Sequence, residues 1–360
     1  MGMILTDEQQ AILDGSRGET MAKVMKTLVM FGEAFHAEKM VPVTSRYNHL
    51  VTSFGLGVLQ PVYDLMQQLI DAGAVSGQKF SADPRPLDPN VPANLLQQLV
   101  FKKFMYNKQD FYEGQLQKLG LMDKDAFTCT CYMPEVGNKP EKGEILSWSE
   151  SSAVVYANSV LGARCNRNSG ILDIMGSIVG YVPYFGLLTD EGRKATWIVK
   201  IETSKKPEAQ LLGSAIGMKV MEDVPYVVGL DKWLGTELDD AACTYLKDFG
   251  AATASNGAVG LYHIANLTPE AKELGEALIA PGAPVCHRRS GAAAHPGRLS
   301  RRLEKPGRAA EALLHGLPAY VARAAEDLDR PCGGLPRRGR TQQGLHPHGL
   351  YRRPRRPEGI

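Results

Sequence analysis

The 360-residue chain has no run of 18 or more apolar residues, and this absence argues against a membrane-spanning helix. Its first residues, MGMILTDEQQ, lack a basic segment followed by an apolar core, so we do not expect a secretory signal there. With 44% hydrophobic and 22% charged residues, the composition is typical of a soluble globular protein. We expect it in the cytoplasm, with no membrane partner.

The chain also lacks the short motifs that mark common cofactor sites. It has no Walker loop, no dinucleotide-binding GxGxxG, no HExxH and no CxxC pair. Cysteine is scarce, with six in the chain, and without an export signal we do not expect a disulfide framework. The roles that stay open to these cysteines are apolar filler, metal ligand or nucleophile.

Charge is divided unevenly along the chain. Residues 1–280 contain 25 Lys and Arg against 33 Asp and Glu, whereas residues 281–360 contain 16 against 6. The second segment has 15 Arg and one Lys, is rich in Pro, Gly and Ala, and lacks Phe, Met and Asn. It is either a basic tail that binds nucleic acid, a Pro/Arg-rich linker, or the product of reading a GC-rich gene in the wrong frame.

We favour the shifted frame for residues 281–360, and thus a disordered or aberrant tail that is not natively folded. The segment Ala310–Arg330 can be back-translated with free choice of third bases. Read one base later, it can spell PKLCFMGC, three residues, and then SLEQLKTWTD, which is ordinary amphipathic sequence. We therefore discount the tail's own cysteines and do not expect nucleic acid as a partner.

Residues 1–280 alternate helical and strand-like patterns. LTDEQQAIL has Thr6 as an N-cap and Gln9 at the capping-box position, and apolar residues from Met21 to Phe35 recur at helical spacing. Strand-like patterns occur in KMVPVTS, FTCTCYM, ATWIVKIE, VPYVVGL and AVGLYHI. We predict an α/β fold with largely parallel, buried sheets, in two or three subdomains.

Hydrogen-bonding side chains are densest in SWSESSAVVYANSVLGARCNRNSG, residues 147–170. Glu150, Ser151 and Ser152 can cap the helix predicted to come after them, and a helix N-terminus is also a place where anions bind. The segment therefore combines a structural explanation with a functional one, and the two are compatible.

The cysteines of residues 1–280 allow several interpretations. Cys129 and Cys131 stand two apart on a presumed strand, so at most one should face a given site, and spacing alone favours one buried thiol and one incidental one. Cys165 lies next to Arg164 and close to Arg167, which would favour a thiolate or hold a carboxylate substrate. Surface ion pairs are the plainer explanation of both arginines. The DPRP loop at residues 83–86 is typical of a structural turn.

The run CTCYMPEVGNKPEKGEILSWSESSAVVYANSVLGARCNRNSG resembles the aconitase X family, also known as DUF521. So do LTDEQQAILDGSRGE, SRYNHLVTSFG, DPRP and HIANLTPEA, and the likeness covers about residues 4–280. It implies an aconitase-like, multi-domain catalytic core and a hydro-lyase that acts on a small hydroxy carboxylate, either cis-3-hydroxy-L-proline or phosphomevalonate. It also implies an iron–sulfur cluster or mononuclear iron held by cysteines, and a separate small subunit whose swivelling domain closes the site.

The resemblance also assigns roles to residues of this sequence. The predicted catalytic residues are Glu150, Ser151 and Ser152, the predicted substrate-binding residues are Asn158, Ser159, Arg164, Asn166, Arg167 and His49, and the predicted metal ligands are Cys129 and Cys165. The base is expected to be a serine of the small subunit. From spacing alone, His49 would be a structural histidine.

Departures from the family pattern qualify these roles. Many archaeal relatives have Pro in place of Cys131 and Thr in place of Cys165, so Cys165 is either an added ligand or a neutral exchange. These departures favour cis-3-hydroxy-L-proline over phosphomevalonate. The family's late Gly-Cys-Pro-His-x-Ser segment is absent as written, but the shifted frame gives a close match to it. If the tail is genuine, the chain is expected to be inactive.

Overall fold

The computed structural model describes residues 2–50, 55–87, 91 and 94–289. All of them fall in one unit, Met1–Ala294, while a second unit, His295–Ile360, lies outside the described residues. The predicted tail is therefore untested from residue 290 onward. Within the described part of the chain, no helix is long and apolar enough to cross a membrane.

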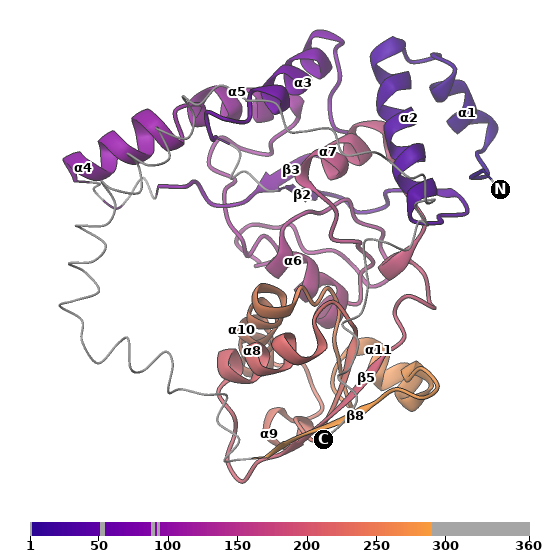
Figure 1. Ribbon diagram of the computed structural model, residues 1–360, viewed down its shortest axis with the longest axis vertical. Helices are drawn as coiled ribbons and strands as arrows, with labels where there is room; N and C mark the ends of the chain where they lie inside the picture. Colours follow the sequence, from indigo (N-terminus) through magenta and orange to yellow (C-terminus); the bar gives the residue numbers. More distant parts are fainter. Residues whose placement is uncertain (1, 51–54, 88–90, 92–93, 290–360) are drawn as a thin grey trace, which may run out of the picture. The chain divides into compact units, whose positions relative to one another are not determined.

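The first half of the chain has more helix than strand, and its described residues form two short sheets (Figure 1). Strands β2 (Asn48–Leu50) and β3 (Phe80–Ala82) pair in parallel, and β1 (Met40–Pro42) pairs antiparallel with β4 (Tyr181–Pro183). The helical segments are α1 (Asp7–Leu13), α2 (Glu19–Ala34), α3 (Gln60–Asp71), α4 (Leu95–Gln97), π-helical η1 (Gln98–Met105), α5 (Gln109–Leu119), α6 (Ser151–Tyr156), π-helical η2 (Ala157–Leu161) and α7 (Gly170–Val179).

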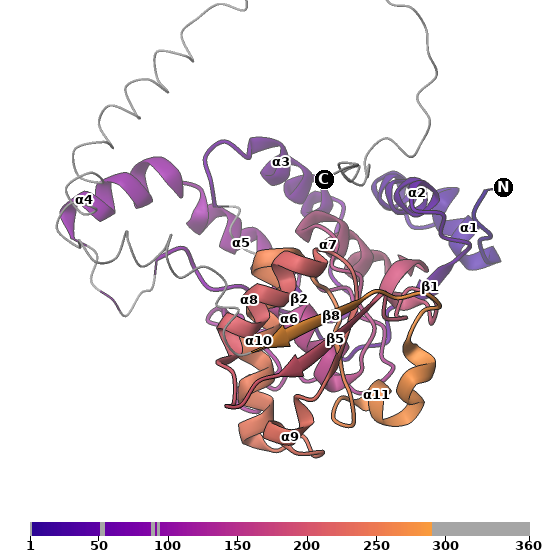
Figure 2. The ribbon, with the colours of Figure 1, turned by 60° about the horizontal axis from the view of Figure 1, so that its bottom comes forward.

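The second half contains a four-stranded, wholly parallel sheet in the order β7-β6-β5-β8. Its strands are β5 (Trp197–Glu202), β6 (Pro225–Val228), β7 (His263–Ile264) and β8 (Val285–Arg289). Its helical segments are η3 (Gly186–Leu188), α8 (Ala209–Val220), α9 (Asp231–Leu234), α10 (Asp240–Gly257), α11 (Pro269–Leu274) and η4 (Gly275–Leu278). Figures 1 and 2 both show α8 and α10 side by side, and α10 also packs on α6.

Several local predictions are confirmed. Thr6 and Gln9 form the capping box of α1, since each side chain bonds the other's backbone N–H. The predicted strands at KMVPVTS, ATWIVKIE and VPYVVGL correspond to β1, β5 and β6, whereas only two residues of AVGLYHI, His263 and Ile264, form β7. The largely parallel α/β fold is confirmed as well.

The strand predicted at FTCTCYM is wrong. Only Phe127 makes a strand-like bridge, to Ala82, and turns come after it. The Thr128 hydroxyl accepts a hydrogen bond from the backbone N–H of Thr130 at 3.1 Å, a local bond that competes with strand pairing. The alternation of residue types in this segment therefore does not indicate a strand.

The domain boundary near residue 280 stays a prediction, and strand β8 lies just beyond it. Strand β8 pairs with β5 over five residues, from Ile198↔Val285 to Glu202↔Arg289. The parallel sheet thus continues into the first residues of the segment that composition assigns to the tail. A short strand such as β8 is hard to predict from its residue types, because backbone hydrogen bonds to the neighbouring strand hold it in place.

Candidate functional site

Three titratable side chains from distant parts of the chain converge on one place. His49 lies on β2, Asp83 comes directly after β3, and Glu150 precedes α6. One ligand atom of each lies within 4.8 Å of those of the other two. The parallel pairing of β2 with β3, together with a parallel bridge between His49 and Trp148, brings these three segments to the same edge.

The His49 ring is oriented by neighbours on both nitrogens. Its Nδ1 lies 2.9 Å from the Ser81 hydroxyl, and its Nε2 faces Asp83 Oδ1 at 3.3 Å. Burial opposes protonation of the ring, but Cys131 and Asp83 outweigh it and raise the pKa of His49 to about 10. Burial also raises the pKa of Asp83, and His49 counteracts that rise.

Glu150 is the N-cap of α6, as the sequence predicted. Its carboxylate accepts hydrogen bonds from the backbone N–H groups of Ser152, at 2.9 Å, and Ala153. The hydroxyls of Ser152, at 2.7 Å, and Ser151, at 3.4 Å, donate to the same carboxylate. Ser151 and Ser152 therefore hold Glu150 in place, and the bond that caps the helix also fixes an anion at the cluster.

Both thiols of the CTC segment lie near this cluster. Cys129 is half-buried, and burial together with the charges of Glu150 and Asp83 raises the pKa of its thiol. Cys131 is fully buried and acts on the pKa of His49. The expectation that only one thiol could face a site depended on the strand that is not formed.

Cys165 has a different environment. Its thiol is fully buried and donates to the carbonyl oxygen of Trp148 at 3.3 Å. Burial, and after it the charge of Asp173, raises the pKa of this thiol well above its usual value. The side chain is therefore a neutral thiol of the apolar core, and its predicted role as a metal ligand stays a prediction.

Of the predicted substrate-binding residues other than His49, Arg167 interacts electrostatically with the cluster. It is partly exposed, and its guanidinium donates to the Ala258 carbonyl at 3.1 Å. Burial lowers the pKa of Arg167, while the charge of Glu150 raises it. Arg167 therefore places a positive charge within electrostatic reach of Glu150.

The other four predicted substrate-binding residues bond to the protein itself. Asn158 joins Cys165 to Gly260, and the Ser159 hydroxyl accepts from the backbone N–H of Tyr262 at 2.9 Å. Further protein bonds are made by Arg164, to Leu188 and Asp190, and by Asn166, to Phe185 and Leu187. That these side chains also contact a substrate stays a prediction.

Arg85 connects the Asp83 loop to its surroundings. Its Nε lies 3.1 Å from both carboxylate oxygens of Glu113 on α5, and one terminal nitrogen donates to the Lys124 carbonyl at 2.7 Å. The guanidinium also lies 4.0 Å from the centroid of the Phe127 ring. Arg85 thus ties together the Asp83 loop, α5 and the segment that leads to Cys129.

Sequence reasoning missed Asp83, because the DPRP pattern is explained by a structural turn alone. One signal could have found it: an acidic residue directly after the buried strand β3, whose three residues are all buried. An acidic residue at the carboxyl end of a buried parallel strand points to a site at the sheet edge.

The donor set fits a transition metal such as iron. An imidazole nitrogen and two carboxylate groups converge within 4.8 Å, and two thiols lie beside them. Imidazole suits iron, and thiolates are the ligands of iron–sulfur clusters. Of the described residues, His49, Asp83 and Glu150 lie close enough together to hold the metal. Cys129 and Cys131 interact electrostatically with these residues and could add thiolates.

Comparisons with known proteins show the family of this chain. The family model "Aconitase X first domain" matches residues 2–191, and "Aconitase X second domain" matches residues 195–287. A crystal structure of Thermococcus kodakaraensis aconitase X (holo-form) superposes with a TM-score of 0.64 at 30% identity, covering 80% of this chain and 67% of that one.

Curated relatives bear two different names. The phosphomevalonate dehydratase large subunit of Thermococcus kodakarensis is 33% identical over 275 residues, which are 75% of this chain and 64% of that protein. Cis-3-hydroxy-L-proline dehydratase of Hypocrea jecorina is 38% identical over 158 residues, 42% of this chain and 25% of that protein. The Pseudomonas aeruginosa enzyme of the same name is 27% identical over 277 residues, 74% of this chain and 44% of that protein. This chain thus spans at most 64% of these relatives' length, and on its two domain matches it belongs to the aconitase X family.

Proposed function

We propose that this chain is the catalytic large subunit of an iron-dependent hydro-lyase that removes water from a small hydroxy carboxylate. The observation that carries the proposal is the convergence of His49, Asp83 and Glu150 within 4.8 Å. Cys129 and Cys131 beside them supply thiols for iron. The dehydratase names of the relatives support the reaction class.

Iron held here would act as a Lewis acid on the leaving hydroxyl of the substrate. The chain's own residues would do the rest of the positioning. Arg167 would bind the substrate carboxylate, since its guanidinium is partly exposed and can form a bidentate pair with a carboxylate. Glu150 would orient the substrate as a fixed anion, since four donors hold its carboxylate.

For the substrate we favour cis-3-hydroxy-L-proline. Its ring ammonium would suit the negative charges of Asp83 and Glu150, and its carboxylate would pair with Arg167. Phosphomevalonate is the second candidate, because a relative whose match covers 75% of this chain is named for it.

We propose a small subunit as the partner that completes the site. The phosphomevalonate dehydratase relatives are named large subunits, and that name implies a smaller companion. The base that removes the substrate proton is expected on that companion. Activity should therefore require both chains.

The test compares Asp83→Asn with Asp125→Asn, a matched change at a side chain that is 66% exposed. Each chain is purified anaerobically with its small subunit, and iron content is measured together with turnover of both candidate substrates. We expect Asp83→Asn to lower turnover at least 100-fold and to reduce bound iron, whereas Asp125→Asn should change neither.

Three outcomes would contradict parts of the proposal. Full activity of Asp83→Asn would show that the His49–Asp83–Glu150 cluster is not part of the active site. Turnover of phosphomevalonate alone would reverse the substrate assignment. A wild-type chain that never holds iron, even with its partner, would favour the alternative of an inactive product of a frame-shifted gene.

A further inference from the structure

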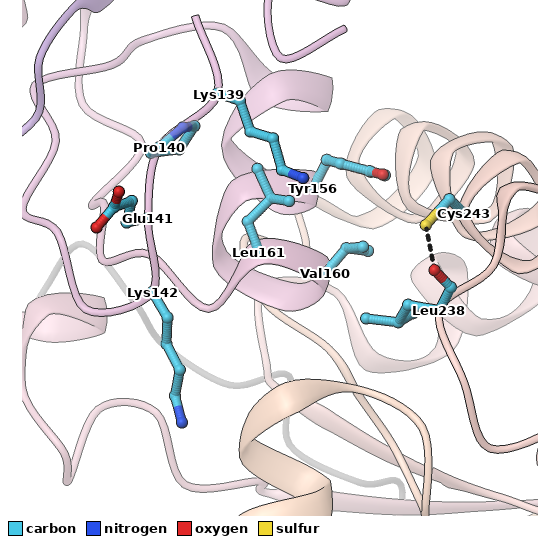
Figure 3. A pocket seen from close by; sticks show the side chains of 9 residues that line it. All are labelled: Lys139, Pro140, Glu141, Lys142, Tyr156, Val160, Leu161, Leu238 and Cys243. Atoms are coloured by element: carbon cyan, nitrogen blue, oxygen red, sulfur yellow. Dashed lines mark hydrogen bonds between the residues drawn. The ribbon is translucent and has the colours of Figure 1, made fainter. Parts of the chain in front are cut away.

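A pocket separate from the His49–Asp83–Glu150 cluster opens between residues 139–142, helix η2 and the start of α10 (Figure 3). Its volume is about 570 Å³, which is typical of small-molecule sites. It is lined by Lys139, Pro140, Glu141, Lys142, Tyr156, Val160, Leu161, Leu238 and Cys243. None of the residues of the cluster contributes to this lining.

One wall of the pocket is apolar, and the groups beside it are polar. Val160, Leu161 and Leu238 form the apolar wall. The Tyr156 hydroxyl and the Cys243 thiol lie beside it, and the thiol donates to the Leu238 carbonyl at 3.6 Å. Such a lining suits a ligand with an apolar body and a polar or charged end.

The charged side chains of the lining leave one cation without a counter-ion. Lys142 Nζ is paired with Glu273 at 2.6 Å, and Figure 3 shows the Glu141 carboxylate turned away from Tyr156. Lys139 has no salt-bridge partner among the described residues, and its side chain extends toward Tyr156 in Figure 3. An anionic group on the ligand would supply the missing partner.

We propose that this pocket binds a small organic anion with an apolar body, and that binding is transmitted to the His49–Asp83–Glu150 cluster. Two structural connections support the transmission. The Tyr156 ring stacks on Tyr132, with centroids 4.0 Å apart and an interplanar angle of 11°. Tyr132 is the next residue after Cys131, whose backbone carbonyl accepts a hydrogen bond from the Asn138 N–H at 3.2 Å.

The second connection runs through Asn138, the neighbour of Lys139. Its side-chain amide donates to the Asn48 carbonyl at 2.8 Å and to the Ser81 hydroxyl at 3.0 Å. Ser81 in turn lies 2.9 Å from His49 Nδ1. A ligand that holds Lys139 would therefore restrict the segment that positions His49.

The experiment uses 8-anilinonaphthalene-1-sulfonate, which joins one sulfonate to apolar rings and reports binding by fluorescence. It is titrated into the full chain, into Lys139→Met, into Leu238→Trp, which fills the pocket, and into Lys26→Met, a matched control at an exposed lysine of α2. We expect saturable binding that Lys139→Met weakens about five-fold, the effect of one exposed ion pair. Leu238→Trp should abolish binding, and Lys26→Met should leave it unchanged.

Equal affinity in wild type, Lys139→Met and Leu238→Trp would overturn the site. That result is expected if the dye binds instead to exposed apolar side chains such as Phe104 of η1, which is 70% exposed. Transmission is measured by hydrogen exchange of peptides that contain Asn48–Leu50 and Phe80–Ala82, with and without the dye. Slower exchange in wild type but not in Leu238→Trp supports the connection, and unchanged exchange during saturable binding overturns it.

Discussion

At the scale of single residues, Arg193 and Glu270 form the most buried Arg–carboxylate pair of the described residues. Arg193 Nε lies 2.7 Å from the Glu270 carboxylate, and the two side chains are 2% and 11% exposed. The guanidinium also donates to the side chain and the backbone of Asn158, at 3.1 and 3.0 Å. The pair thus connects α11 to η2, and the sequence carries no pattern that would reveal it.

We expect Arg193→Met to lower the free energy of unfolding by about 3–5 kcal/mol, because it leaves a buried carboxylate without its charge partner. The double variant Arg193→Met with Glu270→Met should recover most of that loss. Lys142→Met removes a half-exposed pair and serves as the control, with an expected change within about 1 kcal/mol. Urea unfolding measures all three, and equal losses in the single and double variants would contradict the argument.

A second residue-scale prediction concerns Asp173. Its carboxyl is buried, accepts from Ser147 and Asn168 at 3.2 Å each, and has one oxygen without a partner among the described residues. Burial raises the pKa of Asp173 well above its ordinary value. The folded protein therefore favours the protonated carboxyl of Asp173. The stability that this gives is fully present below about pH 4 and is lost as pH rises through the folded-state pKa.

Asp173→Asn keeps the hydrogen-bond acceptor and removes the charge. We expect the variant and the wild type to have similar stability near pH 4, and the variant to become more stable by about 1–3 kcal/mol as pH rises to 8. Asp64→Asn, at an exposed position of α3, controls for the change in net charge. Thermal unfolding across this pH range measures the difference in stability between the variant and the wild type. A difference that stays constant with pH would show that the pKa of Asp173 is not raised in the folded state.

At the scale of elements, the sequence predicted what local chemistry decides. The capping box of α1, the Glu150 cap of α6 and the apolar strands β5 and β6 depend on neighbouring residues. It did not predict β8, which is defined by pairing with a strand far away in the chain. Nor could it place Asp83 beside Glu150, because the pairing of β2 with β3 and the bridge between His49 and Trp148 together bring them to one place.

Close packing of α8 on α10 gives an element-scale prediction. A Cβ added at Gly217 would lie 2.7 Å from the Thr253 carbonyl oxygen, whereas one added at Gly114 of α5 would meet nothing within 4 Å. We expect Gly217→Ala to lower the free energy of unfolding by about 1–3 kcal/mol through overpacking. Gly114→Ala should raise it by about 0.4–1 kcal/mol, because alanine restricts the unfolded chain. Equal effects of the two changes in denaturant unfolding would show that α8 and α10 can move apart freely.

At the scale of the whole molecule, the segment after β8 departs most from the family. The second-domain match ends at residue 287, and the chain spans 64% of the Thermococcus relative. Residues 290–360 lie outside the described residues, and their Arg-rich composition differs from everything before them. A shifted reading frame stays our prediction for this segment: it would account for the change in composition and would restore a Gly-Cys segment close to the one expected from the family resemblance.

We therefore expect the gene, sequenced from codon 270 to beyond codon 360, to show one inserted or deleted base that returns the frame to GC, three residues and SLEQLKTWTD. The corrected chain should then hold iron more tightly than the chain as written, because it regains a cysteine. Anaerobic purification of both chains, with iron measured per polypeptide, tests this second step. A clean frame with the tail as written would mean that this chain lacks an expected part of its site, and the proposal of an active dehydratase would then have to be abandoned.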